Sequence, residues 1–191
     1  MDKLSEYVLE KLRVMPEYAK MYTKDKDVDL PKRRFYFSLE KKCRAFINGD
    51  ETSRVIIIPG LRGTGKTTAI LQLYRFLTEK MGVSQNNVLY LPGDEVVEIL
   101  GVKLNDVLAT YFNTIHGKSP EMLEENVYIF IDEAHFDKSW QITVKVLYDR
   151  SKKVFIVVTG SSSVAMEISP DLARRAEKEV VFPLNFSEYV L

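Results

Sequence analysis

The sequence has very little of three features that define other classes of protein. It contains one cysteine, Cys43, so no disulfide can form within the chain. No stretch approaches the roughly 20 apolar residues that a membrane-spanning helix needs. The N-terminus mixes charged and apolar residues and lacks the uninterrupted apolar run of a secretion signal. We expect a cytoplasmic protein without a membrane partner, in which Cys43 is a small core residue rather than a reactive thiol.

The sequence also has no excess of charge of either sign. Lys plus Arg and Asp plus Glu each number 27, which gives a formal net charge of zero. Without an overall basic field the protein is not expected to bind nucleic acid through its charge, although a local basic patch is compatible with this balance. The 191 residues are 46% hydrophobic and 28% charged. This length and composition suit one soluble globular domain with a sizeable core.

The most informative stretch is rich in glycine and follows the apolar run 55–58. Its residues are Gly60, Leu61, Arg62, Gly63, Thr64, Gly65, Lys66, Thr67 and Thr68. The offsets between the glycines, the lysine and the hydroxyl residue fit the phosphate-loop pattern. Glycine allows left-handed torsions and lets backbone N–H groups approach a triphosphate closely, and the N-terminus of the following helix adds partial positive charge. We expect Lys66 to contact the β- and γ-phosphates and the Thr67 hydroxyl to bind Mg²⁺.

Strands and helices alternate along this part of the chain. Apolar, β-branched runs predict five strands, at 54–59, 87–91, 127–131, 154–159 and 179–182. Apolar residues at helical spacing predict helices at 65–81 and 139–150, and one or two helices each in 94–116 and 162–176. Short connections between them imply a parallel sheet covered by helices on both faces, which is an α/β fold.

Residues 1–30 are interpreted as an N-terminal helical extension. Three apolar residues at a spacing of four predict a short amphipathic helix: Leu4, Val8 and Leu12. We expect this helix to end at Pro16, because proline lacks the N–H of a helical hydrogen bond. The alternating charges of 24–27 predict a solvated loop.

A second N-terminal helix is predicted from Pro31 to about residue 47, since proline suits the first turn of a helix. Arg33 and Arg34 lie near its start. We expect them on a solvated face, with an approach of one of them to a nucleotide as the alternative.

Two adjacent carboxylates follow the predicted strand 127–131. Asp132 and Glu133 therefore stand at the carboxyl end of a strand, where open α/β sheets place their ligands. We expect Asp132 to hold Mg²⁺ through water and Glu133 to orient and polarise the attacking water, which favours hydrolysis. A role in capping the next element is the alternative, and the phosphate loop upstream favours the metal site. His135 and Trp140 are interpreted as structural residues.

Two further pairs of residues have two readings each. The hydroxyl of Thr159 or Ser161, at the end of the fourth strand, is expected to sense a γ-phosphate or the attacking water. The alternative is that Ser161 or Ser162 caps the next helix. Arg174 or Arg175 is expected either to reach the site of a neighbouring protomer, where it would stabilise transition-state charge, or to face solvent.

Taken together, these motifs resemble the AAA+ ATPases of the glutamate-bearing branch of P-loop NTPases, and more narrowly the AAA-family ATPases common in archaea. The resemblance covers about residues 30–191. The stretches that carry it are the phosphate loop with Arg62, Asp94 after the second strand, 129–134 with Trp140, 159–162, and Arg175 followed by 182–189.

The resemblance implies a three-layer α/β/α P-loop NTPase sandwich with strand order 5-1-4-3-2 and an ATPase core over 31–191. It implies ATP and Mg²⁺ as cofactors, and Arg175 as the arginine that acts in trans. A second copy of the chain or another protein is the expected partner. Proteins of this kind continue into a helical lid and a C-terminal domain. We therefore expect the sequence to be the core of a longer protein and its activity on its own to be weak.

Two other functions are compatible with the sequence. One is a switch or scaffold that binds ATP and hydrolyses it negligibly. The other is a nucleic-acid-stimulated, helicase-like fragment, because 132–135 resembles the helicase DEAH box. The balanced charge and the length argue against the second reading.

Overall fold

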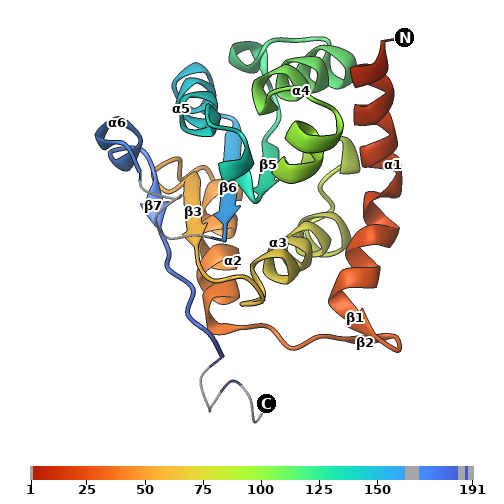
Figure 1. Ribbon diagram of the computed structural model, residues 1–191, viewed down its shortest axis with the longest axis vertical. Helices are drawn as coiled ribbons and strands as arrows, with labels where there is room; N and C mark the ends of the chain where they lie inside the picture. Colours follow the sequence, from red (N-terminus) through yellow and green to blue (C-terminus); the bar gives the residue numbers. More distant parts are fainter. Residues whose placement is uncertain (1, 162–167, 185–187, 189–191) are drawn as a thin grey trace.

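The computed structural model describes residues 2–161, 168–184 and 188. Five parallel strands form its main sheet, with helices packed against both faces (Figure 1). The strands are β3 (Val55–Pro59), β4 (Val88–Pro92), β5 (Val127–Asp132), β6 (Val154–Gly160) and β7 (Glu177–Lys178). Their order is β4-β5-β6-β3-β7. Counted along the chain from β3, this is the predicted order 5-1-4-3-2 read from the other edge, so the predicted fold is confirmed.

Six α-helices surround the sheet in the described chain. They are α1 (Lys3–Thr23), α2 (Arg34–Ile47), α3 (Lys66–Arg75), α4 (Leu104–Tyr111), α5 (Trp140–Arg150) and α6 (Pro170–Ala173). Turns of π-helix continue α3 through Phe76–Lys80 and α4 through Phe112–His116, and a further one is Glu95–Ile99. Turns of 3-10 helix lie at Gln85–Asn87, Pro120–Met122 and Ala134–Phe136. The predicted helices 65–81, 94–116 and 139–150 are confirmed.

The sheet separates two hydrophobic cores. Successive strand residues point to opposite faces, since the side-chain period of a strand is two. Val55 and Ile57 of β3 join the core under α4 and α5, whereas Ile56 and Ile58 join the core under α2 and α3. Cys43 belongs to this second core, and burial raises the pKa of its thiol to about 12. The interpretation of Cys43 as a core residue is confirmed.

Helix α1 shows that the predicted end at Pro16 was wrong. The helix runs for 21 residues with Pro16 inside it. Proline removes one helical hydrogen bond, but Met15 and Ala19 on either side of it are buried in the core of α2 and α3. Burial of this apolar stripe outweighs the local cost of the proline. The sequence-based prediction considered only that local cost.

Helix α1 also covers an edge of the sheet. Val8 and Leu12 are buried in one core, and Met15 and Ala19 in the other, so the helix spans both. It packs against β4, α3 and α4, along one side of the molecule (Figure 1). Strand β4 is the edge strand on that side. An uncovered edge presents unpaired backbone groups, and α1 shields this one.

The segment between α1 and α2 differs from both predictions made for it. Instead of a solvated loop it contains a small antiparallel hairpin of β1 (Lys24–Asp25) and β2 (Val28–Asp29). Lys26 and Asp27 at its turn have φ of 45° and 69°, as tight two-residue hairpin turns require. Helix α2 begins at Arg34 rather than at Pro31, because the chain stays extended through Arg33.

The last strand starts earlier than the predicted 179–182 and is shorter. Beyond it, the N–H groups of Glu179 and Val181 donate to carbonyls of β3, and the pairing ends in a bridge between Gly60 and Val181. Pro170 opens α6, as one of the predicted alternatives required. The other parts of the predictions for this region, at 162–167, 185–187 and 189–191, lie outside the described residues.

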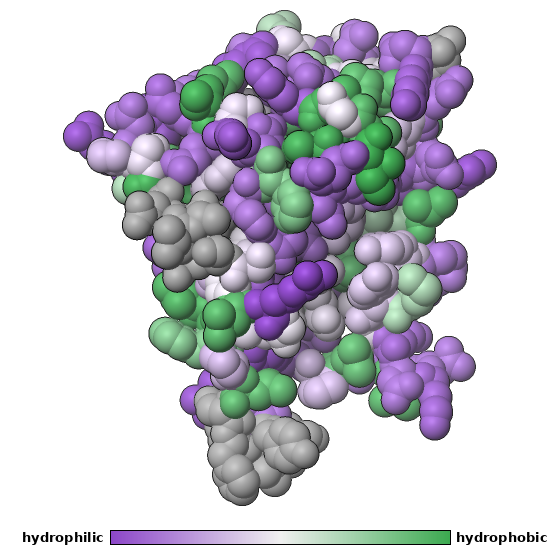
Figure 2. Space-filling view, viewed as in Figure 1, coloured by the Kyte–Doolittle hydropathy of each residue, from purple (hydrophilic) through white to green (hydrophobic). Residues whose placement is uncertain are grey.

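The surface mixes hydrophobic and hydrophilic residues (Figure 2), as expected of a chain in which 28% of the residues are charged. Figure 2 shows hydrophobic residues in small groups among hydrophilic ones on this face of the molecule. Among the described helices, none combines the length and the apolar character that crossing a membrane requires.

The packing of α1 is tested by two leucines of the same helix. Leu12 is 5% exposed and Leu9 is 39% exposed. We expect Leu12→Ala to lower the free energy of unfolding by about 2 to 4 kcal/mol, because it leaves a cavity in the core. Leu9→Ala should change it by less than about 0.5 kcal/mol. Denaturant unfolding measures both, and equal small effects would mean that α1 is not part of the folded domain.

Candidate functional site

The glycine-rich loop joins the end of β3 to the start of α3. Gly63 and Gly65 have φ of 80° and 81°, which residues with a Cβ rarely adopt. Gly60 is required for another reason, since a Cβ there would lie 2.6 Å from the Val181 carbonyl oxygen. Gly63 and Gly65 therefore have the left-handed torsions that the sequence predicted, whereas Gly60 is needed because the Val181 carbonyl leaves no room for a side chain. Gly65 stands directly before α3, so the loop leads into the N-terminus of that helix.

Lys66 is buried against its own loop. Its Nζ donates hydrogen bonds of 2.9 Å to the Gly60 carbonyl and 2.8 Å to the Leu61 carbonyl. Burial lowers the pKa of Lys66, and the carboxylates of Glu133 and Asp132 oppose that shift. Thr68 and the exposed Arg62 line the hollow next to the loop. The arrangement places two cations, Lys66 and Arg62, beside the loop at the N-terminus of α3.

Asp132 is held by hydroxyl groups from three different elements. Thr67, at the start of α3, donates a 2.7 Å hydrogen bond to its Oδ2. Tyr90 of β4 donates to the same oxygen at 2.9 Å, and Thr159 of β6 donates to Oδ1. The carboxylate is 5% exposed. The two residues predicted to bind the metal, Thr67 and Asp132, are thus in direct contact.

The donor set around Asp132 fits Mg²⁺, which takes carboxylate and hydroxyl oxygens. Within the described ranges there is no group of three or more His, Cys, Asp or Glu side chains able to hold a metal ion. Mg²⁺ in phosphate sites does not need such a group, because it is bound through one or two carboxylates together with phosphate oxygens and water. Thr67 and Asp132 are therefore suited to a metal that arrives with a phosphate.

Glu133 lies beside this cluster with a left-handed backbone, at φ 49° and ψ 44°. Its N–H donates to the Thr159 hydroxyl at 3.1 Å. Its Oε2 lies 3.3 Å from Nδ1 of His135. Both atoms are buried, and in the described chain neither has a hydrogen-bond partner of normal geometry. The sequence interpreted His135 as structural and gave no sign of this contact with Glu133.

The two hydroxyl residues that the sequence could not separate differ in position. Thr159 is fully buried and contacts both Asp132 and Glu133. Ser161 follows β6 and is only partly buried. Ser162, the alternative cap, lies outside the described residues. The geometry brings Thr159, rather than Ser161, to the carboxylates.

Arg175 and Arg33, two of the arginines considered in the sequence analysis, differ in their distance from the glycine loop. Arg175 pairs with Asp149 of α5 at 2.8 Å and donates to the Asp171 carbonyl at 2.6 Å, so within this chain it does not reach the glycine loop. Arg33 does reach it, since its guanidinium donates to the Thr64 carbonyl at 2.5 Å. It also pairs with Glu188 at 2.8 Å. The expectation of a solvated face was wrong for Arg33, whose side chain is 16% exposed.

Two hollows lie on either side of the glycine loop. One, of about 510 Å³, lies towards β4 and β5 and is walled by Tyr18 and Tyr22 of α1 as well as by loop residues, Asp132 and Glu133. The other, of about 240 Å³, lies between the loop and the chain before α2, where Leu30, Pro31 and Leu184 line it. Sequence reasoning missed the two tyrosines, because nothing in a helix pattern indicates which distant loop it will face.

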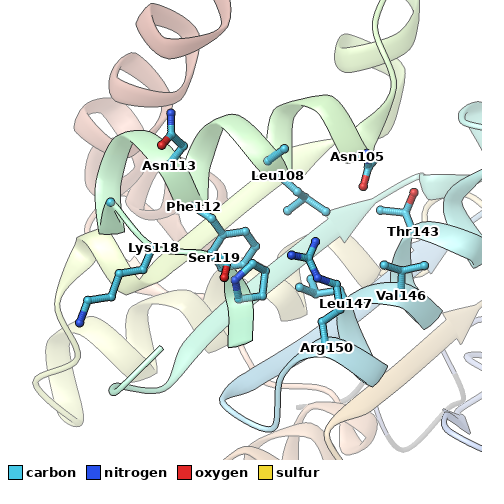
Figure 3. A pocket seen from close by; sticks show the side chains of 13 residues that line it. Asn105, Leu108, Phe112, Asn113, Lys118, Ser119, Thr143, Val146, Leu147 and Arg150 are labelled. Carbon is cyan, nitrogen blue, oxygen red and sulfur yellow. The ribbon is translucent and has the colours of Figure 1, made fainter. Parts of the chain in front are cut away.

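A further hollow, of about 280 Å³, lies between α4 and α5 (Figure 3). Apolar side chains line its floor, among them Leu108, Phe112 and Leu147. Its flanking cations are already paired, Arg150 with Glu121 and Lys118 with Glu124. None of the residues predicted to act on phosphate lines it.

The sequence is similar to those of known proteins. A model of the AAA domain family matches residues 52–190. An uncharacterized protein of Methanocaldococcus jannaschii is 35% identical over 190 residues, which are 100% of this chain and 37% of that protein. Another, from Haemophilus influenzae, is 30% identical over 155 residues, 80% of this chain and 37% of that protein. The chain thus spans 37% of the length of each of these relatives.

Solved structures resemble the fold. The Walker-type ATPase of Pyrococcus abyssi has a TM-score of 0.52 at 17% identity, covering 86% of this chain and 59% of that one. The Orc1 protein of Aeropyrum pernix, solved in complex with DNA, has a TM-score of 0.58 at 17% identity, covering 88% and 49%. Domain III of the Thermotoga maritima replication initiation protein DnaA has a TM-score of 0.51 at 16% identity, covering 83% and 72%.

At these identities the solved structures show a shared fold alone, whereas the family match extends over most of the sequence. It includes the glycine loop and both carboxylates. The chain therefore belongs to the AAA domain family and has the core of a P-loop AAA+ ATPase.

Proposed function

We propose that this chain binds ATP with Mg²⁺, hydrolyses it, and couples its nucleotide state to a conformational change. The observation that carries the proposal is the 2.7 Å contact between the Thr67 hydroxyl and the Asp132 carboxylate, at the end of a glycine loop that also holds Lys66. Phosphate groups bind where backbone N–H groups and a helix N-terminus converge, and a metal that comes with them needs oxygen ligands beside them.

The triphosphate would lie in the glycine loop. The N–H groups between Gly60 and Thr67 would surround it, and Lys66 would turn from its loop carbonyls to the phosphate oxygens. Mg²⁺, held by Thr67 and Asp132, would offset the charge that develops on the phosphate oxygens during transfer. The base has room in the hollow between the loop and Leu30, Pro31 and Leu184.

Glu133 is the residue that we assign to the chemical step. Its carboxylate would accept a proton from a water molecule while the water oxygen bonds to the γ-phosphorus. The bond from that phosphorus to the bridging oxygen breaks, and ADP and phosphate leave. The Thr159 hydroxyl, which accepts the Glu133 N–H, is suited to holding this segment in register with Asp132.

Two further proposals concern the role of Arg175 and the boundaries of the ATPase core. Arg175 would act on the site of a second copy, which requires it to exchange its present pairing with Asp149. We also propose that residues 31–191 are the ATPase core and that lid and effector domains belong to the longer protein. The length of the curated relatives supports this division.

The role of Lys66 is tested by Lys66→Ala. We expect the affinity for MgATP to fall about 100-fold, because two charge-assisted hydrogen bonds to phosphate are lost. Lys41→Ala, which removes an exposed lysine of α2, should leave the affinity unchanged. Isothermal titration calorimetry measures both. Native affinity in Lys66→Ala would mean that the nucleotide does not use this loop.

The role of Glu133 is tested by Glu133→Gln. The amide cannot accept the proton of the attacking water, so we expect single-turnover hydrolysis to slow by about 100-fold or more while ATP still binds. Glu98→Gln, which changes an exposed acid in the turn of π-helix after β4, is the control and should hydrolyse ATP at the native rate. If Glu133→Gln also kept the native rate, Glu133 would not be the base.

A further inference from the structure

Tyr90 joins the sheet edge to the proposed metal site. It is 2% exposed, and its hydroxyl donates to Oδ2 of Asp132 at 2.9 Å. Oδ2 is also the oxygen that accepts from Thr67. A phenol keeps its proton near neutral pH and a carboxylate oxygen can only accept, so the Tyr90 hydroxyl is the donor in this bond.

The sheet register explains why this residue reaches Asp132. Tyr90 is paired with Phe130, and Pro92 is paired with Asp132. Side chains two residues apart point to the same face, so Tyr90 and Asp132 share one face at neighbouring levels. A tyrosine is long enough to bring its hydroxyl to the carboxylate. A phenylalanine at the same place would keep the packing and lose the donor.

Tyr90 is itself in contact with α1. The Tyr18 ring lies 5.9 Å from the Tyr90 ring and 4.6 Å from the Tyr22 ring, measured between centroids. One ion pair also joins α1 to the turn of π-helix that follows β4. Lys11 pairs with Glu95 at 2.5 Å. Helix α1 is therefore linked to Asp132 by the ring contact of Tyr18 with Tyr90 and the hydrogen bond of Tyr90 to the carboxylate.

We propose that Tyr90 is a positioning residue for the metal carboxylate Asp132, and that α1 holds Tyr90 in place through Tyr18. The proposal rests on the proposed function and names how the N-terminal helix takes part in it. A carboxylate that binds a metal is oriented by hydrogen bonds from its surroundings. The loss of such a hydrogen-bond partner lowers the affinity of the site for the metal. Tyr90 restrains Asp132 even when the Thr67 hydroxyl turns to the ion.

The first test uses Tyr90→Phe in the full chain. The slowly hydrolysed analogue ATPγS is titrated by calorimetry at increasing Mg²⁺ concentration. We expect the Mg²⁺ concentration at half-maximal effect to rise about 10-fold in the variant, while metal-free ATPγS binds as in the native protein. Tyr74→Phe is the matched control, because Tyr74 is buried and its hydroxyl has no partner among the described residues. It should titrate as the native protein does.

A native Mg²⁺ dependence in Tyr90→Phe would overturn the role of Tyr90. Equal shifts in Tyr90→Phe and Tyr74→Phe would do the same, since the effect would then be one of stability. If the native protein bound no ATPγS at any Mg²⁺ concentration, the proposed function would fail first, and the inference with it.

The second test separates the ring of Tyr18 from its hydroxyl. Tyr18→Ala removes the packing on Tyr90 and should raise the required Mg²⁺ concentration in the same direction as Tyr90→Phe. Tyr18→Phe keeps the ring and removes only the hydroxyl beside that of Tyr90, so it should shift the Mg²⁺ dependence less than Tyr18→Ala does. Circular dichroism checks that each variant is folded. A native Mg²⁺ dependence in folded Tyr18→Ala would show that α1 has no part in positioning Asp132.

Discussion

The structure of the site depends on the hydrogen bonds that one buried carboxylate, that of Asp132, accepts. Asp132 stands at the end of β5, and its charge is compensated by hydroxyl donors from α3, β4 and β6. A buried charge without such partners would be costly. The three hydroxyls therefore tie the glycine loop to neighbouring strands of the sheet. The chemistry that we propose uses this same point, because a metal can replace part of the hydrogen bonding without leaving the carboxylate unpaired.

Much of the fold and part of the site could be predicted from the sequence. The strands are continuous apolar runs, since both faces of the sheet are covered, and the glycine loop has a spacing that few other structures require. Asp132 ends β5, which β6 separates from β3, but the carboxyl ends of parallel strands all lie at the same edge of the sheet, where the loop begins. Its contact with Thr67 was thus within reach of the sequence alone, and so was the strand order once the family resemblance was recognised.

The remaining features depend on contacts between segments that are distant in the chain. Pro16 was read as a helix end because local hydrogen bonding is visible in a sequence and the burial of α1 against two cores is not. Arg33 meets the glycine loop and Glu188 only after the chain has folded. The positions of Tyr90 and His135 beside the two carboxylates follow from sheet register and from a left-handed residue, and neither leaves a pattern in the sequence.

The most direct test of the account is a crystal structure of the full chain with Mg²⁺ and a slowly hydrolysed ATP analogue. The account predicts phosphates inside the glycine loop, with Lys66 turned from the Gly60 and Leu61 carbonyls towards them. It also predicts a metal ion between the Thr67 hydroxyl and Asp132. A nucleotide bound with its phosphates elsewhere, or a metal that ignores Asp132, would contradict it.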